Sequence, residues 1–150
     1  MKVPGCPLCD GPGGVPVFDG PKFRVIRAQE AGFPAFYRLV WRDHVAEFTD
    51  LAGPDRELCM AAVVEVELLL RSHLRPAKVN LAALGNAVPH LHWHIVARFA
   101  WDSHFPAPVW AAPARGGSPQ ELAAVERLLP ALEADLVSRL ARMPGNYGGS

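Results

Sequence analysis

The chain has 150 residues, and its 15 Lys and Arg residues balance 15 Asp and Glu residues, so the formal net charge is zero. Hydrophobic residues make up 50% of the sequence, which is enough to fill the core of one domain and excludes a disordered chain. The balance of charge argues against binding to duplex nucleic acid or to an anionic membrane, because both partners require a surplus of Lys and Arg. A small anion held by a few local groups remains compatible with this composition.

The apolar segments and the cysteines indicate the compartment. No hydrophobic secretory signal is found at the N-terminus, so we expect a cytoplasmic protein. The most apolar stretch, residues 60–70, is interrupted by two Glu and is shorter than the roughly 20 residues that span a membrane, so we expect no transmembrane helix. Three Cys, an odd number, argue against a disulfide framework, and Cys59 lies in a helical pattern as an expected core thiol.

Cys6 and Cys9 form a C-x-x-C motif in the N-terminal segment, residues 1–20. Two thiolates at this spacing can bind one tetrahedral Zn²⁺, whose remaining ligands must come from His, Asp or Glu elsewhere in the chain. A redox motif would follow a strand and open a helix, which the Gly- and Pro-rich flanks do not favour. A flexible tail without a ligand is the other alternative.

The next elements are two strands and a long helix. Residues 22–27 and 35–41 are rich in β-branched and aromatic residues and predict strands joined by a turn at 32–34. Residues 55–74 have apolar positions at helical spacing, and Pro76 ends the pattern. This helix is apolar over most of its circumference, which is typical of a core helix and would also suit a homodimer interface.

Residues 77–84 and 90–99 predict two more strands, joined by a tight hairpin turn at Gly85 and Asn86. Residues 101–117 have no period and predict an ordered loop. We expect four of its side chains to be buried: Trp101, Phe105, Val109 and Trp110.

A second helix is predicted over residues 118–142, where Ser118 and Glu121 form a capping box. Pro130 should kink this helix, and residues 143–150 should form a flexible tail. The order of strands and helices indicates a single α+β domain.

His90, His92 and His94 alternate with apolar residues, so a strand would carry all three on one face. Such histidines can simply be polar residues on an ordinary strand. Two of them could bind a catalytic metal in a cupin-like or carbonic-anhydrase-like H-x-H site, as a metal-dependent hydrolase would, if an all-β scaffold supplied a third ligand. Alternatively, a neutral His92 can attack a phosphorus atom as a nucleophile, with backbone N–H groups of the turn at 85–87 binding the phosphate.

Residues 85–96, Gly-Asn-Ala-Val-Pro-His-Leu-His-Trp-His-Ile-Val, resemble the signature of the histidine triad (HIT) superfamily. The resemblance extends over roughly residues 20–112 and is strongest to the bacterial diadenosine-polyphosphate-hydrolase-like branch. It implies one domain over residues 1–150 with an α+β fold: a HIT-like antiparallel sheet with a long central helix and, from the helical pattern above, a C-terminal helix. It also implies a homodimer.

The resemblance further implies a hydrolase or transferase that cleaves dinucleoside polyphosphates or nucleoside phosphoramidates at the α-phosphate, without a catalytic cofactor. His92 would form a covalent nucleotidyl-histidine, and His94 would contact the phosphate or help the leaving group. The implied substrate-binding residues are Asn80, Gly85, Asn86 and Ala87, with Glu30 or Gln29 near the ribose.

Some HIT relatives hold a structural Zn²⁺ with an N-terminal C-x-x-C motif and two histidines. By resemblance, the zinc ligands of this chain would be Cys6, Cys9, His44 and His90. This assignment leaves His92 and His94 for catalysis.

Two positions depart from the family pattern. Relatives often have Ser or Thr at the position of Ala87 and Gln at that of Asn86, so a hydroxyl donor to the phosphate is missing here. One hydrogen bond to a charged group is worth about 1.5–3 kcal/mol. The second hypothesis is therefore a non-catalytic nucleotide- or zinc-binding module with the same fold.

Overall fold

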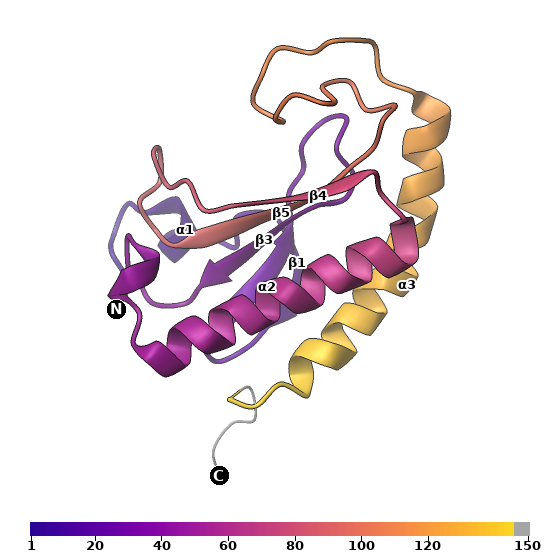
Figure 1. Cartoon of the computed structure of the whole chain (residues 1–150). Helices are drawn as coiled ribbons and strands as arrows, with labels where there is room; N and C mark the ends of the chain where they lie inside the picture. The colour runs from indigo at the N-terminus through magenta and orange to yellow at the C-terminus, as the bar shows by residue number, and fades with distance from the viewer. Residues whose placement is uncertain (146–150) are drawn as a thin grey trace.

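The computed structural model describes residues 1–145 and has one antiparallel sheet of five strands in the order β1-β2-β3-β5-β4 (Figure 1). The strands are β1 (Val15–Asp19), β2 (Phe23–Arg27), β3 (Phe36–Trp41), β4 (Lys78–Ala82) and β5 (His92–Arg98). The helices are α1 (Pro7–Asp10), η1 (Phe48–Asp50), α2 (Gly53–Leu74) and α3 (Pro119–Ala141). The predicted α+β class is confirmed.

The two long helices cover one face of the sheet. Side chains from the strands and from both helices form the main core there. Helix α2 begins with Pro54 in its first turn and ends at Arg75, which adopts the left-handed conformation. Helix α3 is capped by Ser118, whose hydroxyl accepts a hydrogen bond from the Glu121 N–H. Pro130 lies inside α3, and the helix changes direction along its length (Figure 1).

The other face of the sheet carries the histidines. Because directly paired residues on neighbouring strands share a face, the pairing of His94 with Arg38 and of His92 with Val40 puts these four side chains together. The N-terminal segment packs over one part of this face, where its cysteines contact Ile26 and Val40. The loop after β5 covers another part. The histidines lie between the N-terminal segment and the loop after β5.

The strand that carries the triad differs from the prediction. Strand β5 begins at His92 instead of residue 90, and residues 83–91 form a longer connection instead of a tight hairpin turn. The chain leaves the ladder because the Leu91 N–H donates to the Val45 carbonyl, outside the sheet, at 2.7 Å. Pairing between β4 and β5 is antiparallel, as a hairpin requires.

Three elements were not predicted: the helical turn α1 around the C-x-x-C motif, the edge strand β1, and η1. The predicted strand over 77–84 is shorter, and both long helices begin or end within two residues of the prediction. Of the predicted tail, residues 146–150 lie outside the described part of the chain, so its flexibility stays a prediction.

The loop after β5 is ordered, as predicted, and a buried ion pair organises it. Arg98 and Asp102 are 1% and 2% exposed, and two hydrogen bonds of 2.9 and 3.0 Å join them. Burial alone would raise the pKa of Asp102, but Arg98 and three backbone N–H donors in the loop lower it. The prediction that four side chains of this loop are buried is wrong: Trp101, Phe105 and Val109 are half-buried, and Trp110 is 56% exposed.

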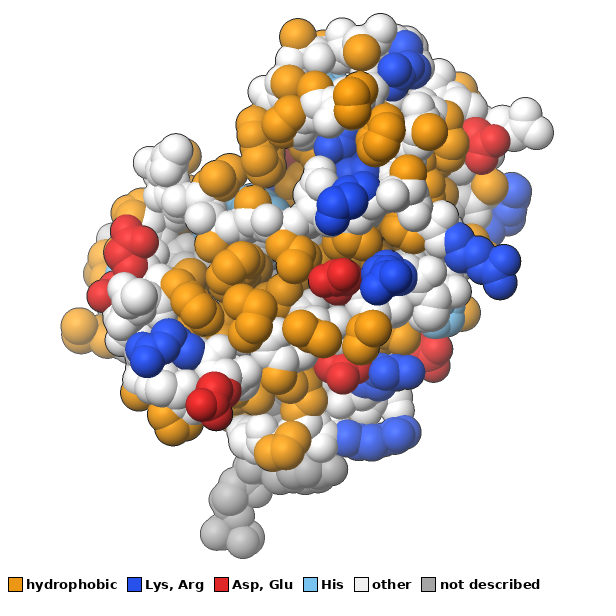
Figure 2. All heavy atoms as spheres, viewed as in Figure 1, with side chains coloured by type: hydrophobic (Ala, Val, Ile, Leu, Met, Phe, Trp, Pro, Cys, Tyr) orange, Lys and Arg blue, Asp and Glu red, His pale blue; other side chains and the backbone are white. Residues whose placement is uncertain are grey.

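Part of the molecular surface is apolar along α2 and the adjacent sheet edge (Figure 2). Val64 and Leu68 on α2 are 43% and 44% exposed, and Leu81 on the edge strand β4 is 39% exposed. We call these three residues the α2–β4 patch. Within residues 1–145, no helix is both long and apolar enough to cross a membrane.

Candidate active site and metal centre

A cavity of about 430 Å³ opens beside the last two histidines of the triad. Strands β3 and β5, the connection before β5 and the N-terminal segment all contribute to it. Its lining residues are Pro7, Leu8, Gly13, Arg38, Leu84, Gly85, Asn86, Ala87, Val88, His92 and His94. The cavity therefore brings together five of the predicted site residues, namely Gly85, Asn86, Ala87, His92 and His94, and we call it the histidine pocket.

Gly85 shapes the wall opposite the strands. Its φ of +68° lies in the left-handed region, which glycine adopts without the steric cost that other residues incur. The connection can therefore turn back over the pocket and bring residues 85–88 to its lining.

The His92 ring is oriented by its own chain. Nδ1 of His92 lies 2.6 Å from the His90 carbonyl oxygen, so Nδ1 must carry the proton and donate. The neutral ring then has its lone pair on Nε2, which has no hydrogen-bond partner among the described residues. This nitrogen is available as a nucleophile.

The His94 ring has the opposite arrangement. Nε of Arg38 donates to Nδ1 of His94 at 3.4 Å, so the ring proton lies on Nε2. Phe36 and Trp110 contact the ring, with centroids 5.6 and 6.0 Å from that of His94. Next to a nitrogen that can attack, His94 thus offers an N–H that can donate.

Both rings are neutral near pH 7. Burial is the main reason that the pKa of His92 is lowered, and Arg38 lowers it further. For His94, burial, His92 and Arg38 lower the pKa to about 4. The ring centroids are 4.9 Å apart, so protonation of either ring would oppose protonation of the other.

Asn80 lies in a neighbouring hollow of about 510 Å³, which His94 also lines. Its side-chain oxygen accepts a 2.9 Å hydrogen bond from Arg98, which fixes the amide. His94 is therefore common to two hollows, one with Asn80 and one with Gly85, and a bound molecule could extend through both.

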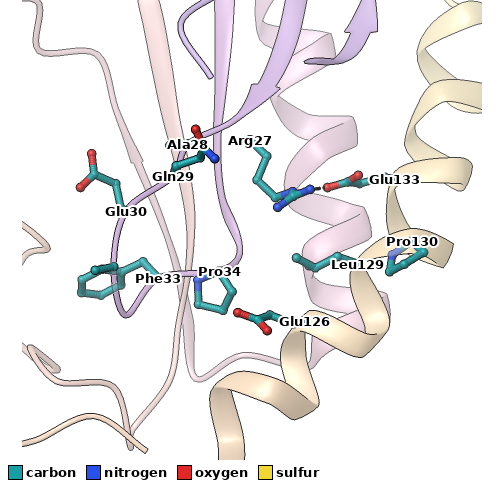
Figure 3. A pocket seen from close by; sticks show the side chains of 11 residues that line it. Arg27, Ala28, Gln29, Glu30, Phe33, Pro34, Glu126, Leu129, Pro130 and Glu133 are labelled. Carbon is teal, nitrogen blue, oxygen red and sulfur yellow. Dashed lines mark hydrogen bonds and ion pairs between the residues drawn. The ribbon is translucent and has the colours of Figure 1, made fainter. Parts of the chain in front are cut away.

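Glu30 does not line either hollow. Together with Gln29 it lines a third hollow of about 540 Å³ between the turn after β2 and helix α3 (Figure 3). There Arg27 pairs with Glu133 at 2.6 Å. Glu30 reaches the histidines only indirectly, through a 3.5 Å contact with Arg38.

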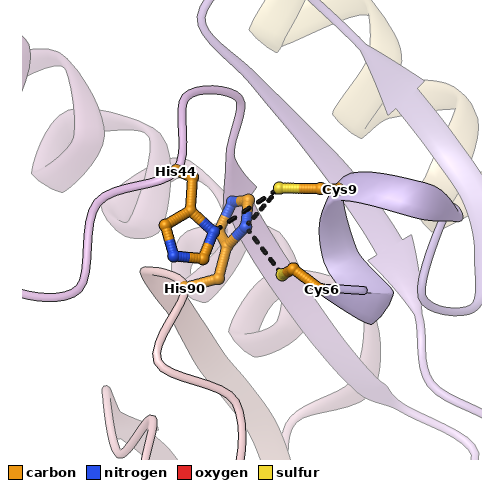
Figure 4. A group of neighbouring side chains, drawn as sticks. All are labelled: Cys6, Cys9, His44 and His90. Atoms are coloured by element: carbon orange, nitrogen blue, oxygen red, sulfur yellow. Dashed lines mark hydrogen bonds between the residues drawn. The ribbon is translucent and has the colours of Figure 1, made fainter. Parts of the chain in front are cut away.

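Cys6, Cys9, His44 and His90 form a compact cluster although they are far apart in sequence (Figure 4). Their ligand atoms all lie within 4.8 Å of one another. The sulfur of Cys6 is 3.4 Å from His90 Nδ1, and the sulfur of Cys9 is 3.4 Å from the same nitrogen and 3.5 Å from His44 Nδ1. In the described part of the chain, this is the one cluster of three or more such ligands.

The spacing of these atoms fits zinc. A tetrahedral zinc ion with Zn–S bonds of about 2.3 Å and Zn–N bonds of about 2.0 Å holds its sulfur and nitrogen ligands about 3.5 Å apart. The far nitrogen of His90, Nε2, donates to the Trp41 carbonyl at 2.7 Å, which turns Nδ1 toward both sulfurs. Burial lowers the pKa of His90, which is fully buried.

The metal cluster and the histidine pocket share two segments. His90 contributes a ring nitrogen to the cluster and its carbonyl oxygen to His92. Pro7 and Leu8, between the two cysteines, line the pocket. The cluster therefore bounds the pocket on one side.

Arg38 is the site residue that the sequence analysis missed. Strand alternation alone would have put it on the face opposite to Tyr37 and Leu39, where an arginine in an apolar run is a signal for function. Its pairing with His94 required the sheet register.

Comparison with known proteins gives one family. A model of the HIT domain matches residues 14–101, which is more than half of the chain. A histidine triad protein from Bradyrhizobium japonicum is 29% identical, with a TM-score of 0.69, and the match covers 83% of this chain and 92% of that chain. A histidine triad protein from Sinorhizobium meliloti is 25% identical, with a TM-score of 0.67 and coverage of 83% and 90%.

A Zn-bound histidine triad family protein from Mycobacterium smegmatis has the same fold. Its TM-score is 0.56 at 18% identity, and the match covers 84% of this chain and 88% of that chain. Among curated proteins, no sequence matches the chain.

Proposed function

The chain belongs to the HIT domain family, and from this premise we propose that it is a nucleotide hydrolase that cleaves nucleoside conjugates at the α-phosphate. The observation that carries the proposal is the pair of complementary rings in one pocket. His92 presents a lone pair on Nε2, whereas His94 presents an N–H on Nε2. Nucleophilic attack on a phosphate needs both an attacking pair and a donor to the phosphate oxygens.

The reaction has two steps. Nε2 of His92 forms a bond to the α-phosphorus, and the bond to the leaving group breaks with its electron pair. A water molecule then forms the new P–O bond, the P–N bond breaks, and the water gives its proton to solvent, which leaves a nucleoside monophosphate. The His90 carbonyl accepts from Nδ1 of His92 throughout and stabilises the positive charge on the nucleotidyl ring.

The state of His94 bears on the leaving group. A neutral ring with its proton on Nε2 is a good hydrogen-bond donor but a very weak acid, so it supports the phosphate more than it protonates a leaving amine. A polyphosphate leaves as an anion and needs no proton. We therefore propose dinucleoside polyphosphates as the preferred substrates, as in the bacterial diadenosine-polyphosphate-hydrolase-like branch.

The test is release of AMP from diadenosine tetraphosphate and from adenosine 5′-phosphoramidate. We expect turnover of the tetraphosphate to be the faster of the two. If neither substrate yields AMP while AMP itself binds, the chain is a non-catalytic nucleotide-binding module, the alternative that the missing hydroxyl at Ala87 favours.

We assign the remaining site residues as follows. Gly85, Asn86 and Ala87 would bind the phosphate through the connection before β5, and Asn80 would bind the ribose from the neighbouring hollow. Glu30 would act only through Arg38. Residues 1–150 would form one domain, with the metal ligands Cys6 and Cys9 in segment 1–20.

For the metal cluster we propose a structural zinc ion held by Cys6, Cys9, His44 and His90. Its support is the ligand set and the sulfur–nitrogen distances of 3.4–3.5 Å. Zinc would fix the N-terminal segment against the sheet and take no part in the chemistry. His92 and His94 lack a third ligand within residues 1–145, which counts against the metal-dependent hydrolase.

A homodimer is proposed through the α2–β4 patch. Strand β4 is one of the two edge strands of the sheet, and unpaired edge groups next to exposed apolar side chains favour pairing with a second copy. We expect light scattering to give twice the chain mass for the wild type and the single chain mass for a Leu68→Glu/Leu81→Lys variant. Leu128→Glu, which changes an equally exposed leucine on α3, should stay dimeric. A monomeric wild type would contradict the proposal.

A further inference from the structure

Arg38 lines the histidine pocket. It is the direct cross-strand partner of His94 on one side and of Ile26 on the other, so the register of three strands fixes its backbone. Its side chain is only 23% exposed, and its guanidinium lies 5.2 Å from the centre of the Phe36 ring. A cation is therefore held in the pocket beside the ring that would attack.

Most of the hydrogen-bonding capacity of this guanidinium is unused. A guanidinium has five N–H donors. Arg38 makes two contacts, to His94 at 3.4 Å and to Glu30 at 3.5 Å, and both are long. Within residues 1–145, its Nη1 has no hydrogen-bond partner.

Two other arginines on the same face of the sheet use their donors in hydrogen bonds within the protein. Arg24 donates to three carbonyl oxygens of the N-terminal segment. Arg98 donates to Asp102, Asn80 and the Ala107 carbonyl. Arg38 is different because its spare donors face a cavity instead of the protein interior.

We propose that Arg38 binds the phosphate of the nucleotide and replaces the hydroxyl donor that Ala87 lacks. This inference rests on the proposed function and deepens it. The planar fork of a guanidinium can bind two phosphate oxygens at once, and a charged donor gives a stronger hydrogen bond than a hydroxyl. The Glu30 carboxylate is 49% exposed and makes only one long contact, so a phosphate can displace it.

The consequence is that the affinity of the pocket depends on phosphate charge. A nucleoside without phosphate would gain nothing from Arg38, whereas a nucleotide would gain a charge-assisted pair of hydrogen bonds. We therefore expect AMP to bind well and adenosine to bind weakly, although the chain has no net charge.

The test compares the affinities of AMP and adenosine, by calorimetry, for the wild type and for Arg38→Gln, Arg38→Lys and Arg139→Gln. We expect Arg38→Gln to weaken AMP binding about ten- to hundredfold without changing adenosine binding. Arg38→Lys should retain part of the effect, since it keeps the charge but not the fork. Arg139→Gln, which breaks an exposed pair with Glu65 on the helical side, should change neither affinity.

Three results would overturn the inference: AMP affinity within twofold of the wild type in Arg38→Gln, equal loss of AMP and adenosine binding, or a wild type that does not distinguish the two ligands. The proposed hydrolase activity is tested separately by AMP release from diadenosine tetraphosphate. A chain that releases no AMP but loses AMP affinity in Arg38→Gln would disprove the hydrolase and support the role of Arg38.

Discussion

Replacing His92 by alanine should lower the turnover of diadenosine tetraphosphate roughly a thousandfold or more, because the substitution removes the nitrogen that attacks the phosphorus. The loss should appear in kcat more than in AMP binding, since Arg38 and the connection at 85–88 remain. Turnover is measured as AMP release at saturating substrate, beside AMP affinity by calorimetry.

A matched control is available on the helical side of the molecule. His73 on α2 contacts Asp135 on α3 at 2.7 Å and does not line the histidine pocket, so His73→Ala should keep wild-type turnover. A second variant, His92→Gly, leaves space for free imidazole, which should restore part of the AMP release as an external nucleophile. Equal turnover in the wild type and His92→Ala would reject the covalent mechanism.

Trapping the nucleotidyl-histidine intermediate is an independent test of the nucleophile. Rapid quenching under alkaline conditions, in which phosphohistidine is stable, should give a chain whose mass is increased by one nucleotidyl group. We expect this species for the wild type and not for His92→Ala. If a residue other than His92 carried the nucleotidyl group, the assignment of His92 as the nucleophile would be wrong.

Elements with a strong local pattern could be predicted from the sequence. Strands β2 and β3 and helices α2 and α3 have the expected period and clear Pro or Ser boundaries. Strand β1 was missed because it contains Pro16 and shifts its register before Phe18, and both features weaken the alternation of an edge strand.

The triad shows where local pattern fails. Alternation predicts one face for three histidines, but only His92 and His94 belong to β5. His90 lies before the strand, because the hydrogen bonds of Leu91 and Trp41 and the cysteines of a distant segment determine its position. Such contacts depend on tertiary structure, so the alternation of residues along a single sequence does not predict them.

The position of some site residues could be predicted from the sequence, and that of others could not. The cluster of Cys6, Cys9, His44 and His90 has the membership that the family resemblance implied. Glu30, by contrast, lies in the turn after β2, where it lines a different hollow and its carboxylate contacts Arg38. Arg38 has a visible signal in strand alternation, but its contact with His94 follows only from the pairing of β3 with β5.

Removal of the zinc ion should destabilise the protein and loosen the pocket without stopping the chemistry. The protein as purified should contain one zinc per chain, and Cys9→Ser should contain none. We expect the variant to lose about 3–4 kcal/mol of unfolding free energy, the stabilisation conferred by a ligand at 100 to 1,000 times its Kd, which lowers Tm by roughly 10 °C. Zinc content is measured by metal analysis and Tm by calorimetry.

The effect on the substrate follows from Pro7 and Leu8, which form one wall of the histidine pocket and lie between the two cysteine ligands. Below its lowered Tm, Cys9→Ser should show a raised KM for diadenosine tetraphosphate and a nearly unchanged kcat, because His92 keeps its hydrogen bond to the His90 carbonyl. Cys59→Ala, which removes a buried thiol of α2, should retain one zinc and the wild-type KM. If a strong chelator abolished kcat in a protein that stayed folded, the metal would act in catalysis, and the assignment of His92 as nucleophile would be wrong.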